Sequence, residues 1–289
     1  MTLIAAHRPP VSQLSSFPTA ASEPVSAADE AATVLMCRPA TDGRDLHSWG
    51  PRAVAFDLAR AAEQWDALRE TIVSLGVTVD VLEGSTALAS QFACGDAALV
   101  SGSQALVARF AQSHRDGERT IAAASLAQRG LELIEPPGSV VFEASQAVVS
   151  NLTLFGGWFQ TSELLGLRWA ARKLTMRLVP VRLEADDFDR LDLCFRPLRD
   201  EIALIVPEAL STASLTQIRD HVSLLLPVPI DEAHRGACAA VVFGHHVVVP
   251  ASCPVTQAML DAAGFAVHPV DVSEFLSLGC SLSGLVLSL

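Results

Sequence analysis

Short apolar runs of strand length alternate along this chain with longer segments whose apolar positions recur at helical spacing. The first run, Thr33–Ala40, predicts a buried strand that ends at Pro39. Residues 54–75 then carry apolar side chains three and four positions apart, which predicts a helix ended by Gly76. A further strand is expected at Val77–Leu82. The chain therefore opens as strand, helix, strand.

The later units repeat this order with one additional strand. Two strand-like runs, a helix and a strand follow one another about five times. The predicted helices are 117–129, 163–174, 214–222 and 255–264, and the predicted strands are 92–100, 104–110, 131–134, 140–149, 152–159, 179–183, 191–196, 201–206, 224–230, 238–243, 246–250, 266–270 and 282–289. Repeats of this kind suit a ring of modules better than a doubly wound sheet. We expect an α/β propeller of five ββαβ modules in a pseudo-fivefold arrangement around a central pocket.

Residues 1–31 differ from the rest of the chain in composition. They carry four prolines among serine, alanine and threonine, and such a segment buries too little apolar surface to fold by itself. We expect a flexible arm over 1–31 and a single domain over 32–289. The N-terminus lacks a basic stretch followed by a long apolar core, which predicts no signal peptide and a cytoplasmic protein.

Composition and charge exclude two classes of partner. Half of the 289 residues are hydrophobic, enough for a large core, yet no apolar run approaches the roughly 20 residues of a membrane-spanning helix. The net charge is −12 and no basic patch occurs, so neither nucleic acid nor an anionic membrane is expected as a partner. Lys173 is the only lysine and tyrosine is absent, which is typical of a GC-rich bacterial genome.

The residues that commonly bind metals show no metal-binding spacing. The six cysteines form no CxxC pair, and most lie in apolar runs, so they are expected to be reduced and buried. His245 and His246 are adjacent, which predicts a hairpin turn rather than one shared ion. Asp186, Asp187 and Asp189 predict a solvated acidic loop. No cofactor fingerprint occurs, and neither a cofactor nor a metal is expected.

Short segments spread in order over residues 33–289 carry a family resemblance. They are Leu35–Pro39, Gln64–Leu68, Phe92–Val100, Ala108–Phe110, Leu191–Leu198, Val249–Pro254, Gly264–Phe265 and Val270–Phe275. Together they resemble the pentein superfamily, and they are most similar to its bacterial dimethylargininase and amidinotransferase-like hydrolases. The resemblance implies a chemistry in which a cysteine thiolate attacks a guanidinium carbon, a histidine transfers protons, and carboxylates hold the planar cation.

Two residues required by that chemistry are replaced here. The resemblance places Gly284 at the position of the nucleophilic cysteine and Arg190 at the position of the histidine. Glycine has no side chain to attack with, and arginine stays protonated in proteins, so it cannot act as a general base. Cys280, four residues before Gly284, is the remaining candidate nucleophile.

Candidate ligand-binding residues follow from the same resemblance. Asp192 matches an acidic position of the family and Asp96 falls near an Asn or Asp position, whereas Gln146 and Gln160 stand where the family has an aspartate and an arginine. Arg190 is either a solvated residue at a strand entrance or a partner of Asp192, Asp96 or an anionic ligand. Four positions of one site thus depart together from the pattern that the parent reaction needs.

Three functions are compatible with these residues. The first is a non-catalytic scaffold, sensor of a small polar or guanidino ligand, or partner of an active paralogue. The second is an enzyme repurposed for an arginine-derived or other small polar substrate, with Cys280, Asp96 or Asp192 as working groups. The third is a hydrolase or transferase that acts on a guanidine C–N bond through Cys280. The joint departures favour the first, and self-association into a homo-oligomer is a further expectation.

Overall fold

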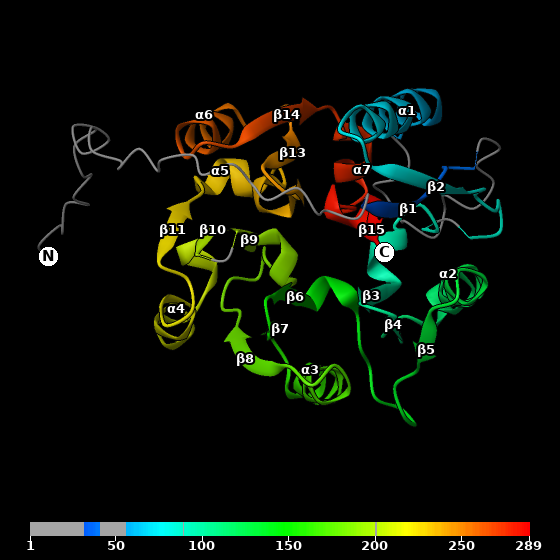
Figure 1. Cartoon of the computed structure of the whole chain (residues 1–289), viewed down its shortest axis with the longest axis horizontal. Coiled ribbons are helices and arrows are strands. Elements are labelled where there is room, and N and C mark those ends of the chain that lie inside the picture. The colour runs from blue at the N-terminus through cyan, green and yellow to red at the C-terminus, as the bar shows by residue number, and fades with distance from the viewer. Residues whose placement is uncertain (1–31, 41–55, 89, 200) are drawn as a thin grey trace, which may run out of the picture.

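Five three-stranded sheets surround a common centre, and helices lie on the outside (Figure 1). The computed structural model describes residues 32–40, 56–88, 90–199 and 201–289. The arm expected over 1–31 lies outside the described residues. None of the helices in these ranges is long and apolar enough to cross a membrane.

Most helices and strands lie close to the predicted ranges. The helices are α1 (Leu58–Ser74), α2 (Asp116–Gln128), α3 (Thr161–Lys173), α4 (Thr212–Arg219), α5 (Ile230–Ala233), α6 (Pro254–Ala262) and α7 (Ser273–Ser277). The strands are β1 (Thr33–Cys37), β2 (Thr78–Leu82), β3 (Ala98–Ser101), β4 (Gln104–Val107), β5 (Glu132–Ile134), β6 (Ala147–Ser150), β7 (Thr153–Trp158), β8 (Arg177–Arg182), β9 (Phe195–Arg199), β10 (Ile202–Ile205), β11 (Leu224–Pro227), β12 (Val241–Phe243), β13 (His246–Pro250), β14 (Ala266–Val270) and β15 (Leu287–Ser288).

Every sheet is built from the same module. An inner strand pairs antiparallel with a middle strand, and the middle strand pairs in parallel with an outer strand, as β3, β4 and β5 do. The parallel pair needs a crossover, which α2 supplies in that module. In α1 the crossover helix buries Ala61, Trp65, Leu68 and Ile72, which are spaced so that they share one face. The predicted five ββαβ modules are thus confirmed.

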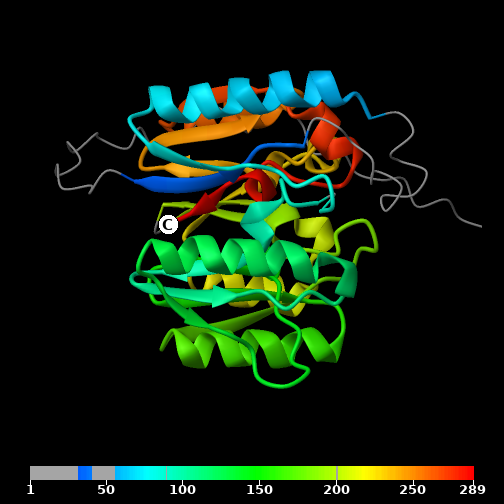
Figure 2. The same cartoon turned by 90° about the vertical axis from the view of Figure 1, so that its right-hand side faces the viewer.

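The first sheet joins both ends of the described chain. Strand β15 pairs antiparallel with β1, with Leu287 opposite Leu35, and β1 pairs in parallel with β2. Figure 2 shows β15, in red, beside β1, in blue. The ring of sheets is therefore closed by pairing between the last strand and the first.

Near the axis, the structure corrects the strand prediction in all five modules. The strands expected over 92–100, 140–149, 191–196, 238–243 and 282–289 begin later, and each is preceded or opened by a single 3₁₀ turn: Cys94–Asp96, Ala144–Gln146, Leu191–Leu193, Ala237–Ala239 and Ser283–Leu285. We call these the axial turns. Their hydrogen bonds close locally, as from Ala97 N to Cys94 O at 3.1 Å, so sheet pairing starts only after them. The turns pack against one another around the axis.

Smaller expectations were tested as well. All six cysteines are free and buried, as predicted. The predicted hairpin at Gly244–His245 joins β12 to β13. The apolar run 224–230 is a strand only to Pro227, because Pro229 precedes the short helix α5.

Candidate functional site

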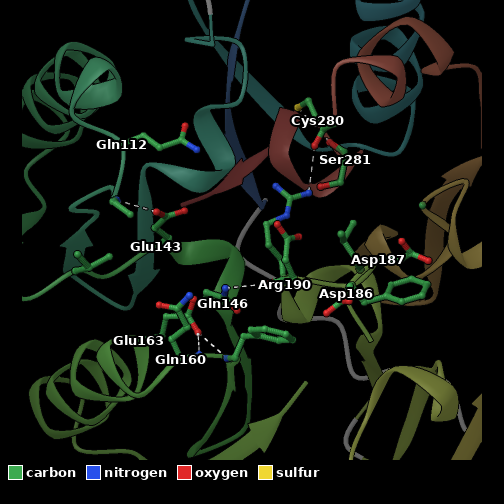
Figure 3. A pocket seen from close by; sticks show the side chains of 18 of the residues that line it. Gln112, Glu143, Gln146, Gln160, Glu163, Asp186, Asp187, Arg190, Cys280 and Ser281 are labelled. Atoms are coloured by element: carbon green, nitrogen blue, oxygen red, sulfur yellow. Dashed lines mark hydrogen bonds between the residues drawn. The ribbon is translucent and has the colours of Figure 1, made fainter. Parts of the chain in front are cut away.

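A cavity of about 1160 Å³ lies at the centre of the ring, with residues from several modules around it. Of the candidate residues, Gln146, Gln160, Arg190 and Cys280 line this central cavity (Figure 3). Asp96 and Asp192 do not stand in its wall; they line a second, smaller cavity of about 210 Å³. The structure therefore brings four of the six candidate residues together in one cavity.

Arg190 extends over the axial turn Leu191–Leu193 and joins the two cavities through ion pairs. Its Nε atom lies 3.5 Å from Asp192 Oδ1 and its Nη1 atom 3.7 Å from Asp96 Oδ2, while Nη2 donates to Gly279 O at 3.4 Å. Burial acts to lower the pKa of Arg190, but the Asp192 and Asp96 carboxylates outweigh it, and the pKa lies above its ordinary value. The side chain is fully charged and lies between the two cavities.

Asp192 is held by two serine hydroxyl groups at and just before the last axial turn. Its Oδ2 atom accepts hydrogen bonds from Ser281 Oγ at 2.9 Å and Ser283 Oγ at 2.8 Å. Asp192 and Asp96 are each 4% exposed, so their charges depend on neighbouring cations and hydroxyls rather than on water. Asp96, Arg190 and Asp192 form what we call the axial ion cluster.

Arg115 is a residue of the central cavity that the sequence did not single out. Its guanidinium lies 2.9 Å from Glu118 and 3.4 Å from Asp96, and it stacks over the Phe110 ring at 4.0 Å. Burial acts to lower its pKa, yet Asp96 and Glu118 raise it above the ordinary value. Arg115 stands just before α2, where a charged residue is unremarkable in sequence, so no pattern marks it.

Cys280 lies in the wall of the central cavity but is only 3% exposed. Its thiol donates to Ser281 O at 3.5 Å, and burial raises its pKa well above the ordinary value. A cysteine in that state is a thiol rather than a nucleophilic thiolate at neutral pH. A Cβ atom at Gly284 would lie 3.2 Å from Cys280 Sγ and 3.6 Å from Asp96 Oδ1, so a side chain there would adjoin the axial ion cluster.

Two glutamines and two glutamates form the wall opposite Cys280 in Figure 3. Gln146 Nε2 donates to Asp189 O at 2.8 Å. Glu163 caps the start of α3 by accepting from the backbone of Gln160 at 3.0 Å. Glu143 accepts from Ala111 N at 3.0 Å, and burial raises its pKa. Gln146 and Glu163 thus have structural partners as well as a place in the wall.

The acidic loop over residues 186–189 also reaches the central cavity. Asp186, Asp187 and Asp189 line it, which extends the prediction of a purely solvated loop. Asp187 is exposed and lies 3.6 Å from His234 Nε2. The two arginines in the wall already have carboxylate partners, so the remaining carboxylates make the cavity acidic. Within the described residues, no group of three or more His, Cys, Asp or Glu side chains is placed to hold a metal ion.

Comparison of the sequence with known proteins identifies enzymes that modify arginine. No protein-family model matches the chain. An uncharacterized protein of Caenorhabditis elegans is 29% identical over 93% of this chain and 99% of its own length. The N(G),N(G)-dimethylarginine dimethylaminohydrolase of Mycobacterium tuberculosis is 28% identical over 82% of this chain and 78% of its own length. ArgZ of Synechocystis, a bifunctional arginine dihydrolase/ornithine cyclodeaminase, is 28% identical over 76% of this chain, but only 32% of ArgZ is covered.

Solved structures agree with the sequence comparison. The N-terminal domain of ArgZ, an arginine dihydrolase, superposes with a TM-score of 0.82 and 27% identity over 89% of this chain and 97% of that domain. AgrE gives the same TM-score at 26% identity, over 89% of this chain and 39% of its own. The ring of five ββαβ modules and these relatives together show that the chain has the pentein fold and that its homologues are arginine-modifying enzymes of the pentein superfamily.

Proposed function

We propose that this chain is a non-catalytic pentein whose central cavity binds a small polar ligand, so that the protein serves as a sensor or as a partner of an active paralogue. The observation that carries the proposal is the state of Arg190. Its guanidinium lies between Asp96 and Asp192 with a raised pKa, at the position where the family resemblance expects a histidine base.

A fixed cation at this position opposes the parent reaction in two ways. Arginine cannot take up the proton that a general base must accept. Its charge also repels a guanidinium substrate, and it engages the two carboxylates that would otherwise hold one. The axial ion cluster therefore already contains a cation supplied by the protein itself, although Asp192 Oδ1 accepts no hydrogen bond from the described residues, which supports a role in binding rather than turnover.

The nucleophile position supports the same conclusion. Gly284 offers no attacking atom, and the nearby Cys280 is buried with a pKa well above its ordinary value. A thiolate is needed for attack on a guanidinium carbon. The environment of Cys280 thus favours the unreactive form.

A guanidine hydrolase or repurposed enzyme that uses Cys280 is the second candidate. One observation favours it: Cys280 lies in the wall of the central cavity, where a bound ligand could reach it. In that function the thiol would have to lose its proton on ligand binding, and Arg190 and Arg115 are the cations that would stabilise the thiolate, since both act to lower its pKa.

Turnover and binding assays with the purified protein separate the two candidates. We expect no citrulline, ornithine, amine or ammonia to be released from arginine, dimethylarginine or agmatine above a heat-denatured control. Binding of the same compounds is followed in parallel by calorimetry. Turnover that is abolished in Cys280→Ser and retained in Cys253→Ser, a buried cysteine outside the wall of the central cavity, would overturn the proposal in favour of the second candidate.

A further inference from the structure

A pair of histidines meets on the sheet of β12, β13 and β14, outside the residues that line the two cavities. His246 begins β13, and His268 lies on the parallel strand β14 opposite Val248. His246 and Val248 are two positions apart on one strand, so their side chains project from the same face. The fold thereby brings two imidazoles from positions 22 residues apart onto one face of the sheet.

The two rings face each other through nitrogen atoms. His246 Nδ1 lies 3.0 Å from His268 Nε2, and the ring centroids are 5.1 Å apart. The ring of His245 also lies against His246, with a centroid distance of 3.9 Å. Gly244, at φ +58°, makes the tight turn that places His245 there. The adjacent pair His245–His246 that stands out in the sequence is therefore completed by a third histidine from another strand.

A neutral imidazole can donate a nitrogen lone pair to a metal ion. In the neutral pair one ring donates an N–H to the other. When that proton moves to the other nitrogen of the same ring, His246 Nδ1 and His268 Nε2 each have a free lone pair. Both lone pairs then lie in the gap between the two rings.

We propose that His246 and His268 form a binding site for one divalent transition-metal ion of the copper, nickel and zinc group, with water completing the coordination. Two nitrogens bound to one ion at about 2.0 Å lie about 2.8 Å apart in a square-planar site and about 3.3 Å apart in a tetrahedral one. The observed 3.0 Å falls between these values, so the nitrogen spacing fits one ion once the two rings turn their lone pairs towards it. Imidazole favours these ions over Ca²⁺ and Mg²⁺, which prefer oxygen ligands.

Titration of the full chain with Cu²⁺ tests the site. We expect the first equivalent to give an electron paramagnetic resonance spectrum of a two-nitrogen site. His246→Gln and His268→Gln should each weaken this equivalent by at least about tenfold, because one of two strong ligands is lost, and should remove the two-nitrogen pattern. Zn²⁺ and Ni²⁺ should compete with Cu²⁺ for this site in the wild type, as measured by calorimetry. This competition should be absent in the same variants.

Two further variants distinguish this site from other histidines of the chain. His114→Ala, in the turn before α2, should bind the first Cu²⁺ equivalent as the wild type does, and His245→Ala should keep the two-nitrogen pattern. Circular dichroism confirms that each variant is folded. The proposal is overturned if folded His246→Gln and His268→Gln bind Cu²⁺ as tightly as the wild type, or if His245→Ala loses the site as fully as His246→Gln.

Discussion

At the scale of single residues, one arginine determines the character of the central cavity. Arg190 contacts Asp96, Asp192 and Gly279 O within 3.7 Å. Asp192 also accepts hydrogen bonds from two serine hydroxyls. A guanidinium is thus already present between the two carboxylates, as a side chain of the protein itself. The charge balance of the cluster depends on that side chain, since Asp96 and Asp192 are buried.

Removing Arg190 should leave a gap that free guanidinium can fill. We expect Arg190→Ala to lower the free energy of unfolding by about 3 kcal/mol, because two buried carboxylates lose a cation. Guanidinium chloride at about 10 mM, too dilute to denature, should recover part of this loss relative to sodium chloride. Thermal unfolding at fixed ionic strength measures both effects.

The matched control is an exposed arginine. Arg60 pairs with Asp271 and Glu274, and its side chain is 54% exposed, so Arg60→Ala should change the melting temperature little and show no guanidinium effect. Equal responses of the two variants would show that the cluster holds no guanidinium-shaped gap.

A second residue-scale prediction concerns the thiol of Cys280. Because burial raises its pKa well above the ordinary value, the thiolate fraction at pH 7 lies below the few per cent of an unperturbed cysteine. We expect iodoacetamide to leave the native protein unlabelled, as judged by intact mass, and to add six groups after denaturation, one for each cysteine of the chain. A single fast adduct that maps to Cys280 would contradict this prediction and support the hydrolase.

The sequence indicated part of this site. Pairing of Arg190 with Asp192 and Asp96 was among the alternatives, because charged residues near one strand entrance have few other partners. Arg115 was missed, since its contact with Asp96, 19 residues earlier in the chain, forms only once the module has folded. The meeting of His246 with His268 was missed for the same reason, because the parallel register of β13 and β14 creates it.

At the scale of elements, periodicity predicted the helices and the outer strands but not the axial turns. Helix α1 has one apolar face and a clear Gly76 stop, and both features are visible in sequence. An axial turn such as Cys94–Asp96 is short and apolar at its flanks, so it looks like the start of the strand that follows. This turn packs so closely against the turn Ser283–Leu285 that position 95 requires glycine, since a Cβ there would collide with the Ser283 carbonyl oxygen.

One helix start is held by a carboxylate from another helix. Glu232 in α5 is 1% exposed and accepts hydrogen bonds from Val255 N at 2.8 Å and from Thr256 N and Oγ1 at 2.7 Å. We expect Glu232→Ala to lower the free energy of unfolding by about 3 kcal/mol, because buried N–H groups at the start of α6 lose their acceptor. Urea unfolding followed by circular dichroism measures the loss.

The neighbouring residue provides the control for this prediction. Asp231 carries the same charge, but it is 67% exposed and pairs with Arg235 on the surface, so Asp231→Ala should cost less than about 0.5 kcal/mol. If the two variants lost equal stability, charge alone would be responsible and the capping of α6 would not matter.

At the scale of the whole molecule, the ring has a seam where β15 pairs with β1. The other four sheets are each built from consecutive strands, whereas this one needs both ends of the described chain. The repeat pattern in the sequence predicted five modules, but local patterns do not show how the first module obtains its inner strand. That strand follows the axial turn Ser283–Leu285. The strand pairing that closes the ring therefore also builds the cavity.

Ending the chain at Gly284 should therefore prevent stable folding. The deletion removes Leu285, Val286 and Leu287, which are at most 6% exposed, and burial of three such side chains contributes about 5 to 8 kcal/mol. That loss is comparable with the total stability of a typical domain. Leu287→Ala alone should cost about 3 kcal/mol and leave a folded protein, whereas Leu152→Ala, at a side chain 75% exposed, should have little effect. Urea unfolding ranks the three variants. A shortened chain that unfolds cooperatively at the wild-type midpoint would mean that the ring is stable without its seam.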